Sequence, residues 1–286
     1  MNKLWYGVGL VLGLIVLVVG QVSGEKLRIV ACNVGQGDGI LIIKGQSQVL
    51  VDGGPSGEKI LSCLGEQMPF YDRQIELIVL TNTDYDHMNG LSSVIERYQV
   101  RQFVTADGVH ESVALDKLRA RLVERSIGVS AVEQGDMLRI LGQDKIELKV
   151  LWPPEVEEQY VAVFGDQVGA EELQQILGAS AKRGNLNERS VVLLLLEDNY
   201  RGLLMGDAGF QAEKELVKSG LLVDVDYLKV GHHGSKYASS AEFLAVVKPE
   251  VAVISVGEGN RYGHPTEEVL ARLKGVGAEV RRTDEE

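Results

Sequence analysis

The stretch Leu77-Ile-Val-Leu-Thr-Asn82-Thr-Asp84-Tyr-Asp86-His87-Met-Asn-Gly90 contains an apolar run that ends abruptly in polar side chains. Four of them, Asn82, Asp84, Asp86 and His87, are of types that bind metal ions. A buried strand brings its backbone to the rim of a sheet, and the loop after it can bring carboxylate and imidazole together without burying an unpaired charge. The same residue types also build turns and cap helices, so a solvated turn is the competing interpretation of this segment alone.

Potential ligands also follow later apolar runs, usually beside a glycine. Asp207, His232, His233 and His264 each occupy such a place, and His87 does so in the first stretch. Four of the chain's five histidines are therefore found where an apolar run ends. A chance distribution would scatter them, so the repetition favours a metal centre over unconnected turns.

Seven short motifs follow one another in a fixed order: Val34-Gly-Gln-Gly-Asp38, Val51-Asp52-Gly-Gly54, Asp84-x-Asp86-His87, Asn187-Glu-Arg-Ser190, Gly206-Asp207-Ala208, Gly231-His-His-Gly-Ser235 and Arg261-Tyr-Gly-His264-Pro265. In this order they resemble the metallo-β-lactamase superfamily, and more narrowly the hydrolase domain of ComEC-type competence (DNA-uptake) proteins. The similarity runs from about Leu27 to Asp284. It implies an α/β (α+β) fold, a four-layer αββα sandwich, with a shallow site at one edge of two facing sheets that holds one or two divalent ions.

The resemblance also implies a ligand set. Asp86, His87, Asp207 and one of His232 or His233 match the superfamily's second metal site. The sequence does not rank the two adjacent histidines: one is expected to be a ligand and the other to contact a ligand or the substrate.

The first metal site is less complete. Asp84 matches a ligand of that site, with Asp207 shared as a bridge, but Asn82 stands where the superfamily signature has its first histidine. An amide oxygen coordinates hard cations and is a poor zinc ligand. An Asn/Ser pattern at 185–190 also replaces a third-motif histidine. We therefore expect one tightly bound ion, zinc or manganese. The alternative is two ions, of which the second is bound more weakly and prefers oxygen ligands, as manganese and magnesium do.

The expected activity is hydrolysis of a phosphodiester, with DNA as one candidate substrate, because the resemblance implies it. A divalent ion lowers the pKa of a bound water from ~16 toward ~7. Asp84 or Asp207 would orient or deprotonate that water, while Ser235, Lys236 and His264 would stabilise charge on the substrate. The alternative is a metal- or substrate-binding module with lost or weakened catalysis, which Asn82 suggests.

Three further residues have two interpretations each. Asp38, among glycines, fits a hairpin turn better than direct catalysis. Asp52 is expected to orient a metal ligand from behind rather than only to build a turn. His264 is expected to touch the scissile group or its leaving oxygen, against a purely structural hydrogen bond to a loop carbonyl.

Composition agrees with one globular hydrolase domain spanning residues 25–286. With 286 residues and 45% hydrophobic content, the chain can bury a large core. The two cysteines, Cys32 and Cys63, are expected to be buried free thiols rather than a disulfide. The net charge of −12 disfavours general nucleic-acid binding. A local basic patch remains open, with four candidates: Lys229, Lys236, Lys248 and Arg261.

Residues 1–24 have the pattern of a signal peptide or membrane anchor. Lys3 precedes an uncharged apolar stretch, Leu4–Gly20, which as a helix would be about 26 Å long, slightly less than the ~30 Å core of a bilayer. Val22-Ser-Gly24 offers small residues of the kind that signal peptidases accept. We expect export, with the protein secreted or anchored in the membrane through residues 4–20 and the catalytic domain outside the cytoplasm. The oligomeric state stays open.

Hydrophobic periodicity predicts alternating strands and helices. The expected strands are Leu27–Ala31, Ile40–Lys44, Gln48–Asp52, Ile75–Leu80, Val100–Thr105, Met137–Ile140, Ile146–Trp152, Val191–Leu196, Leu203–Met205, Tyr227–Val230 and Val251–Ser255. The expected helices are Lys59–Gln67, Leu91–Arg97, Ala114–Ser126, Gln211–Ser219, Ala241–Val247 and Thr266–Lys274. Between the two halves, Glu155–Arg183 fits no strand period and is expected to be a solvated excursion or a lid at the site.

Overall fold

The first half of the chain builds a mixed sheet of six strands. In the computed structural model, which describes residues 26–106, 112–141, 144–154 and 186–285, the strand order is β1-β2-β3-β5-β7-β8. The strands are β1 (Arg28–Ala31), β2 (Ile40–Lys44), β3 (Ser47–Val51), β5 (Leu77–Leu80), β7 (Gln102–Thr105) and β8 (Gly128–Ala131). The first three pair antiparallel through short connections, and the last three join in parallel.

Helices cover the outer face of this sheet. They are α2 (Gly57–Gln67), α4 (Leu91–Arg97) and α5 (Val113–Glu124). Ser56 and Ser112 cap α2 and α5, because each side chain accepts a hydrogen bond from a backbone N–H in the first turn. A two-stranded ladder of β4 (Gln74–Ile75) and β6 (Gln99–Val100) lies beside them. Leucine and isoleucine side chains of the helices pack on this sheet in one core.

The second half builds a seven-stranded sheet in the order β15-β14-β13-β12-β11-β10-β9. Its strands are β9 (Met137–Ile140), β10 (Ile146–Trp152), β11 (Val192–Glu197), β12 (Tyr200–Leu204), β13 (Tyr227–Lys229), β14 (Val251–Ile254) and β15 (Glu279–Arg282). Its outer face carries α7 (Phe210–Ser219), α8 (Ala241–Val247) and α9 (Glu267–Gly275).

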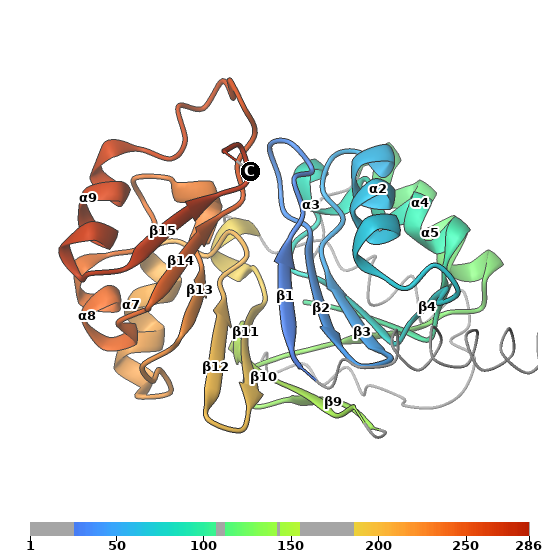
Figure 1. The fold of residues 1–286 in the computed structure, drawn as a ribbon, viewed down its shortest axis with the longest axis horizontal. Helices are drawn as coiled ribbons and strands as arrows, with labels where there is room; N and C mark the ends of the chain where they lie inside the picture. The colour runs from blue at the N-terminus through green and yellow to red at the C-terminus, as the bar shows by residue number, and fades with distance from the viewer. Residues whose placement is uncertain (1–25, 107–111, 142–143, 155–185, 286) are drawn as a thin grey trace, which may run out of the picture.

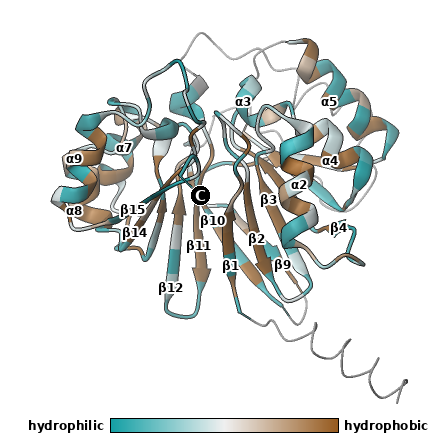
Figure 2. Cartoon of the chain, turned by 45° about the horizontal axis from the view of Figure 1, so that its top comes forward, coloured by the Kyte–Doolittle hydropathy of each residue, from teal (hydrophilic) through white to brown (hydrophobic). Residues whose placement is uncertain are grey.

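The two sheets face each other and the helices lie outside, which confirms the expected αββα sandwich (Figure 1). Strand alternation explains the layers. In β2, Ile40 and Ile42 enter the core between the sheets, while Leu41 and Ile43 enter the core under the helices. Figure 2 shows the strands as predominantly hydrophobic, whereas the helices alternate between hydrophobic and hydrophilic residues. Burial on both faces explains why these strands are continuous apolar runs.

Two strands were not predicted from the sequence. β8 contains a single strongly apolar residue, Val129, and β15 is mostly charged because it lies at the edge of its sheet. Both are held by parallel pairing to a neighbouring strand, a long-range contact that local periodicity does not report.

The expectation of two free thiols is wrong. Cys32, just after β1, and Cys63, on α2, form a disulfide with a Cα–Cα distance of 5.8 Å. Helix α2 packs over the loop that follows β1, and this tertiary contact brings together two cysteines that are 31 residues apart in the sequence.

Two sequence expectations lie outside the described residues: the apolar leader at 1–24 and the insertion Glu155–Arg183. Of the helices in the part of the chain that the structure describes, none combines the length and the apolar character needed to cross a membrane.

Candidate metal centre

His87 lies on α3 (Tyr85–Met88), the short helix that follows β5. Its ring is fully buried, and Nδ1 donates a hydrogen bond of 2.8 Å to Asp52 Oδ2. Asp52 also accepts hydrogen bonds from the backbone N–H and the hydroxyl of Thr81, at 2.8 and 2.7 Å. With Nδ1 engaged as a donor, Nε2 is left facing the site, as in metal-ligating histidines oriented by a carboxylate. Asp52 thus takes the orienting position expected from the sequence.

The two adjacent histidines, His232 and His233, lie on a strained turn, η2 (Gly231–Gly234), directly after β13. His232 and His233 have φ of 46° and 53°, a left-handed conformation that is costly for residues with a Cβ. Glycine is required on either side. A Cβ at Gly231 would lie 2.5 Å from the carbonyl oxygen of Ala208, and Gly234 has φ +79° with Pro265 close by. The turn therefore fixes the directions of both imidazoles.

His233, rather than His232, points into the centre. Its Nδ1 donates a hydrogen bond of 2.9 Å to the carbonyl oxygen of Ser255. Its Nε2 lies 3.3 Å from Asp86 Oδ2 and 3.4 Å from Asp207 Oδ1. The same Asp207 oxygen lies 3.2 Å from His87 Nε2. The two rings therefore converge on the two carboxylates.

Three atoms at this point lack a hydrogen-bond partner in the described structure although they are buried: His87 Nε2, His233 Nε2 and Asp207 Oδ1. Ligand atoms of Asp86, His87 and His233 also lie within 4.8 Å of one another. Buried polar atoms without partners are costly, and a divalent cation would satisfy all of them together. Two imidazoles with two carboxylates suit zinc or manganese. The residues therefore fit the metal that the sequence predicts.

His232 lies at the rim of this centre. Its side chain is 31% exposed, and Nε2 lies 3.9 Å from Asp207 Oδ2 and 3.3 Å from Asn187 Nδ2. The ring centroid of His264 lies 5.8 Å away. His232 therefore borders both the candidate metal site and the side from which a substrate would approach.

The proposed first metal site is less well assembled. Asn82 is buried and engages both ends of its amide: Oδ1 accepts from the backbone N–H of Asp84 at 2.8 Å, and Nδ2 donates to Ser190 Oγ at 3.1 Å. Asp84 belongs to neither of the two groups of closely spaced ligand atoms found in the described residues. The structure brings Asp86, His87, His233 and Asp207 together, and it leaves Asn82 and Asp84 beside them.

A buried ion pair lies behind the centre and was missed in the sequence. Lys229 Nζ, on β13, donates to Asp38 Oδ2 and, at 3.2 Å, to the carbonyl oxygen of Gly206. Lys229 is 1% exposed, so its assignment to a surface basic patch is wrong. The available signal was a lysine within an apolar strand, because a buried ammonium requires a partner. Asp38 does more than form a turn: Oδ1 lies 3.3 Å from His233 Nδ1.

Charges in the centre shift one another's pKa values. Burial disfavours the imidazolium of His233, but the carboxylates of Asp207 and Asp38 outweigh it and raise its pKa to about 9. The pKa of His87 is likewise raised well above its usual value, because Asp207 and Asp52 outweigh the effect of burial. Conversely, His87 and His233 overcome burial to hold the pKa of Asp207 well below its usual range. Opposite charges thus stabilise one another without a metal.

His264 approaches the centre from the opposite loop. Asn260 holds its backbone: the amide oxygen accepts from His264 N at 3.1 Å and the amide nitrogen donates to His264 O at 2.7 Å. The ring stacks on Tyr262, with 5.9 Å between centroids, and lies beside His232. Burial, together with the neighbouring His232 and His233, lowers the pKa of His264, which favours its neutral form.

The sequence and the fold place the chain in a family. A model of the metallo-beta-lactamase superfamily matches residues 32–258, and the chain belongs to that superfamily. Among curated proteins it is 27% identical over 233 residues to ComE operon protein 3 of Bacillus subtilis (strain 168), covering 80% of this chain and 26% of that protein. It is 26% identical over 278 residues to Recombination protein 2 of Haemophilus influenzae, covering 94% of this chain and 29% of that protein.

These relatives agree with the resemblance to ComEC-type competence proteins seen in the sequence. The chain spans under a third of the length of each. Among solved structures, the metallo-beta-lactamase fold protein YhfI from Bacillus subtilis superimposes with a TM-score of 0.54 at 12% identity, over 90% of this chain and 94% of that one. At this identity the likeness concerns the fold alone.

Proposed function

We propose that the chain is a metal-dependent phosphodiesterase. The observation that carries the proposal is the convergence of His87 Nε2, His233 Nε2 and Asp207 Oδ1, all buried and without a hydrogen-bond partner in the described structure. Asp86 Oδ2 completes the set at 3.3 Å from His233 Nε2. A divalent ion held by these four side chains would acidify a water and withdraw charge from a phosphoryl oxygen.

The remaining residues have distinct roles in this proposal. Asp52 and the carbonyl oxygen of Ser255 fix the ring orientations of His87 and His233 by holding their Nδ1 protons. Asp84 orients the attacking water at the edge of the centre. His264, at the opposite rim, contacts the leaving oxygen with a ring that favours its neutral form at pH 7.

The choice of a phosphodiester as substrate rests on the names of the relatives and on the position of Lys236 next to the histidine turn. The curated relatives are named as a ComE operon protein and a recombination protein, which makes DNA the first substrate to test. Ser235 and Lys236 follow the histidine turn directly, and the Lys236 ammonium lies 5.1 Å from the ring centroid of Tyr237. In this proposal Lys236 supplies a cation next to the histidine turn, in spite of the net charge of −12.

The proposed location is outside the cytoplasm, through a signal peptide or an anchor at residues 1–24. The Cys32–Cys63 disulfide supports this location, because such bonds persist in oxidising compartments and are rare in the cytosol. A full-length fusion to a reporter that is active only after export should give signal. A reporter that stays inactive, with soluble full-length protein in the cytoplasm, would rule this location out.

The activity is tested by measuring metal content and turnover on the same purified protein. We expect bound zinc or manganese, together with hydrolysis of bis-p-nitrophenyl phosphate and of single-stranded DNA that stops when a chelator removes the metal. The competing function, a binding module with lost catalysis, predicts metal without turnover of any diester. It is motivated by the amide of Asn82, which is already engaged by Asp84 and Ser190.

A further inference from the structure

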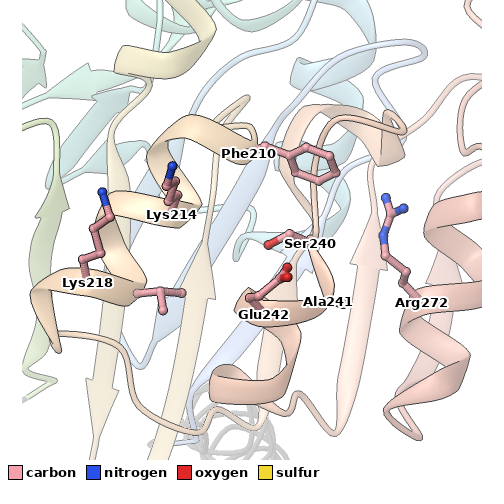
Figure 3. Close-up of a pocket in the computed structure, with 8 residues that line it drawn as sticks. Phe210, Lys214, Lys218, Ser240, Ala241, Glu242 and Arg272 are labelled. Carbon is pink, nitrogen blue, oxygen red and sulfur yellow. The ribbon is translucent and has the colours of Figure 1, made fainter.

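A pocket of about 530 Å³ lies between α7, the start of α8 and α9, on the helical layer of the second sheet (Figure 3). Its lining combines apolar side chains with cations, among them Phe210, Val217, Ala241, Lys214, Lys218 and Arg272. We call it the α7 pocket. Its volume is in the range of pockets that hold small organic ligands.

The pocket presents an aromatic ring that is held in place. Phe210 is 38% exposed, and the Arg272 guanidinium lies 5.6 Å from its ring centroid. Arg272 is itself fixed, because it donates hydrogen bonds to the carbonyl oxygens of Lys236, Ala238 and Ser239. A held, partly exposed ring is a surface on which another flat ring can stack at little entropic cost.

The charge of the pocket is opposite to that of the protein. Lys214, Lys218 and Arg272 line it against one acidic side chain, Glu242, in a chain of net charge −12. Lys218 pairs with Glu215 at 2.7 Å, while Lys214 has no ion pair in the part of the chain that the structure describes. The pocket therefore complements an anion that also carries an apolar ring.

Two short loops of the chain link the α7 pocket to the candidate metal centre. Phe210 follows Asp207 in the turn that opens α7, and its backbone N–H donates a 2.9 Å hydrogen bond to the carbonyl oxygen of Tyr237. Tyr237 follows the histidine turn, is 61% exposed, and meets Phe210 edge to face with 6.5 Å between ring centroids. The loop that supplies Asp207 thus leads directly to Phe210, which lines the α7 pocket, and the loop after His233 supplies the Tyr237 ring that contacts Phe210.

We infer that the α7 pocket binds one nucleotide of a single-stranded nucleic acid whose neighbouring phosphodiester lies at the metal centre. The base packs on Phe210, and a phosphate lies between Lys214 and Lys218. An unpaired base is required, because a base inside a duplex does not expose its face for stacking. The inference rests on the proposed phosphodiesterase function and adds a substrate subsite to it.

The test compares two substrates on the metal-loaded protein: bis-p-nitrophenyl phosphate, which has no neighbouring nucleotide, and a 12-mer oligothymidylate. The variants are Phe210→Leu, which removes the ring, Phe210→Tyr, which keeps it, and Lys214→Ala. Lys117→Ala, an exposed lysine on α5 in the other helical layer, is the matched control.

We expect Phe210→Leu to raise KM for the oligonucleotide about tenfold, as for the loss of one base stack, and Phe210→Tyr to stay near wild type. Affinity falls as salt rises, and Lys214→Ala should make this dependence shallower: the magnitude of the slope of log affinity against log salt should decrease by about 0.7, the value for one phosphate contact with a single strand. Turnover of the small diester should be the same in all four variants. Equal losses on both substrates, or no change in oligonucleotide KM, would overturn the subsite.

Binding of a fluorescein-labelled phosphorothioate 12-mer, followed by anisotropy, separates the subsite from the activity. If the wild-type protein hydrolyses neither substrate, the phosphodiesterase proposal fails while weaker binding by Phe210→Leu and Lys214→Ala still supports the pocket. Competition with polyglutamate distinguishes the ligand chemistry. Displacement by polyglutamate as strong as by oligothymidylate would show that the pocket responds to charge alone, which contradicts a base-binding site.

Discussion

Lys229 Nζ donates a buried hydrogen bond to Asp38 Oδ2, which joins residues 191 positions apart and ties the two halves of the sandwich together behind the candidate metal centre. Both side chains are almost fully buried. Burial raises the pKa of Asp38, but the nearby Lys229 and His233 outweigh it and lower that pKa to about 2. The ammonium of Lys229 thus offsets one carboxylate charge at a site where three others, Asp52, Asp86 and Asp207, are gathered.

Removing either member of this pair should leave the other charged and buried. We expect Lys229→Met and Asp38→Asn each to reduce the free energy of unfolding by about 3–5 kcal/mol. The double variant should lose much less than the sum of the two, because it buries no unpaired charge. Urea denaturation of the four proteins measures this. Additive losses would show that the two residues do not compensate each other; Lys218→Met, from an exposed pair, is the control and should change little.

The Cys32–Cys63 disulfide should contribute to stability by restricting the unfolded chain. Replacing both cysteines by alanine is expected to cost about 3–4 kcal/mol, given the sequence separation of 31. Thiol titration of the unreduced, denatured protein provides a direct check. Two reactive thiols per chain in protein purified from an oxidising compartment would show that the bond is absent.

Asn82→His should improve the first metal site. The imidazole would supply a nitrogen ligand beside Asp84. It replaces an amide that accepts a hydrogen bond from Asp84 N and donates one to Ser190 Oγ. We expect a higher ratio of metal to protein or tighter metal binding, measured by elemental analysis after dialysis. Asn89→His, at the C-terminal end of α3, is the control. Unchanged metal content in Asn82→His would mean that position 82 does not contribute to metal binding.

Metal binding should release protons. The pKa of His233 is raised from 6.5 to about 9 because Asp207 and Asp38 outweigh burial, so without metal this ring is charged at pH 7. Ligation needs the neutral ring, and metal affinity should therefore rise as pH increases from about 6.5 to about 9. In the metal-free protein the raised pKa stabilises the fold below pH 6.5, and this contribution is lost as pH rises through about 9.

Calorimetric titration of zinc at pH 7, in two buffers of different ionisation enthalpy, reports the proton count. Equal binding enthalpies in the two buffers would mean that no proton leaves, contrary to the shifted pKa of His233.

Hydrophobic periodicity predicted most strands because buried strands in this fold are continuous apolar runs whose ends carry glycine and polar residues, and the layers were implied by the motif resemblance. It also placed Asp86, His87 and Asp207 in one site. It did not choose between His232 and His233, because that depends on the left-handed backbone of both residues, which no local pattern specifies. Lys229 and the disulfide were misassigned for a related reason: each depends on a partner far away in the chain.

Asp207 is expected to help hold a catalytic cation. Asp207→Asn keeps the size of the side chain and removes its charge, so the variant should lose bound metal and diester hydrolysis together. His264→Ala should instead retain metal and lower turnover, because that ring faces the substrate side. Metal content and bis-p-nitrophenyl phosphate turnover, measured on the same preparations, distinguish a metal ligand from a residue that acts on the substrate. Asp207→Asn with wild-type metal and wild-type hydrolysis would contradict the placement of the active centre at Asp86, His87, Asp207 and His233.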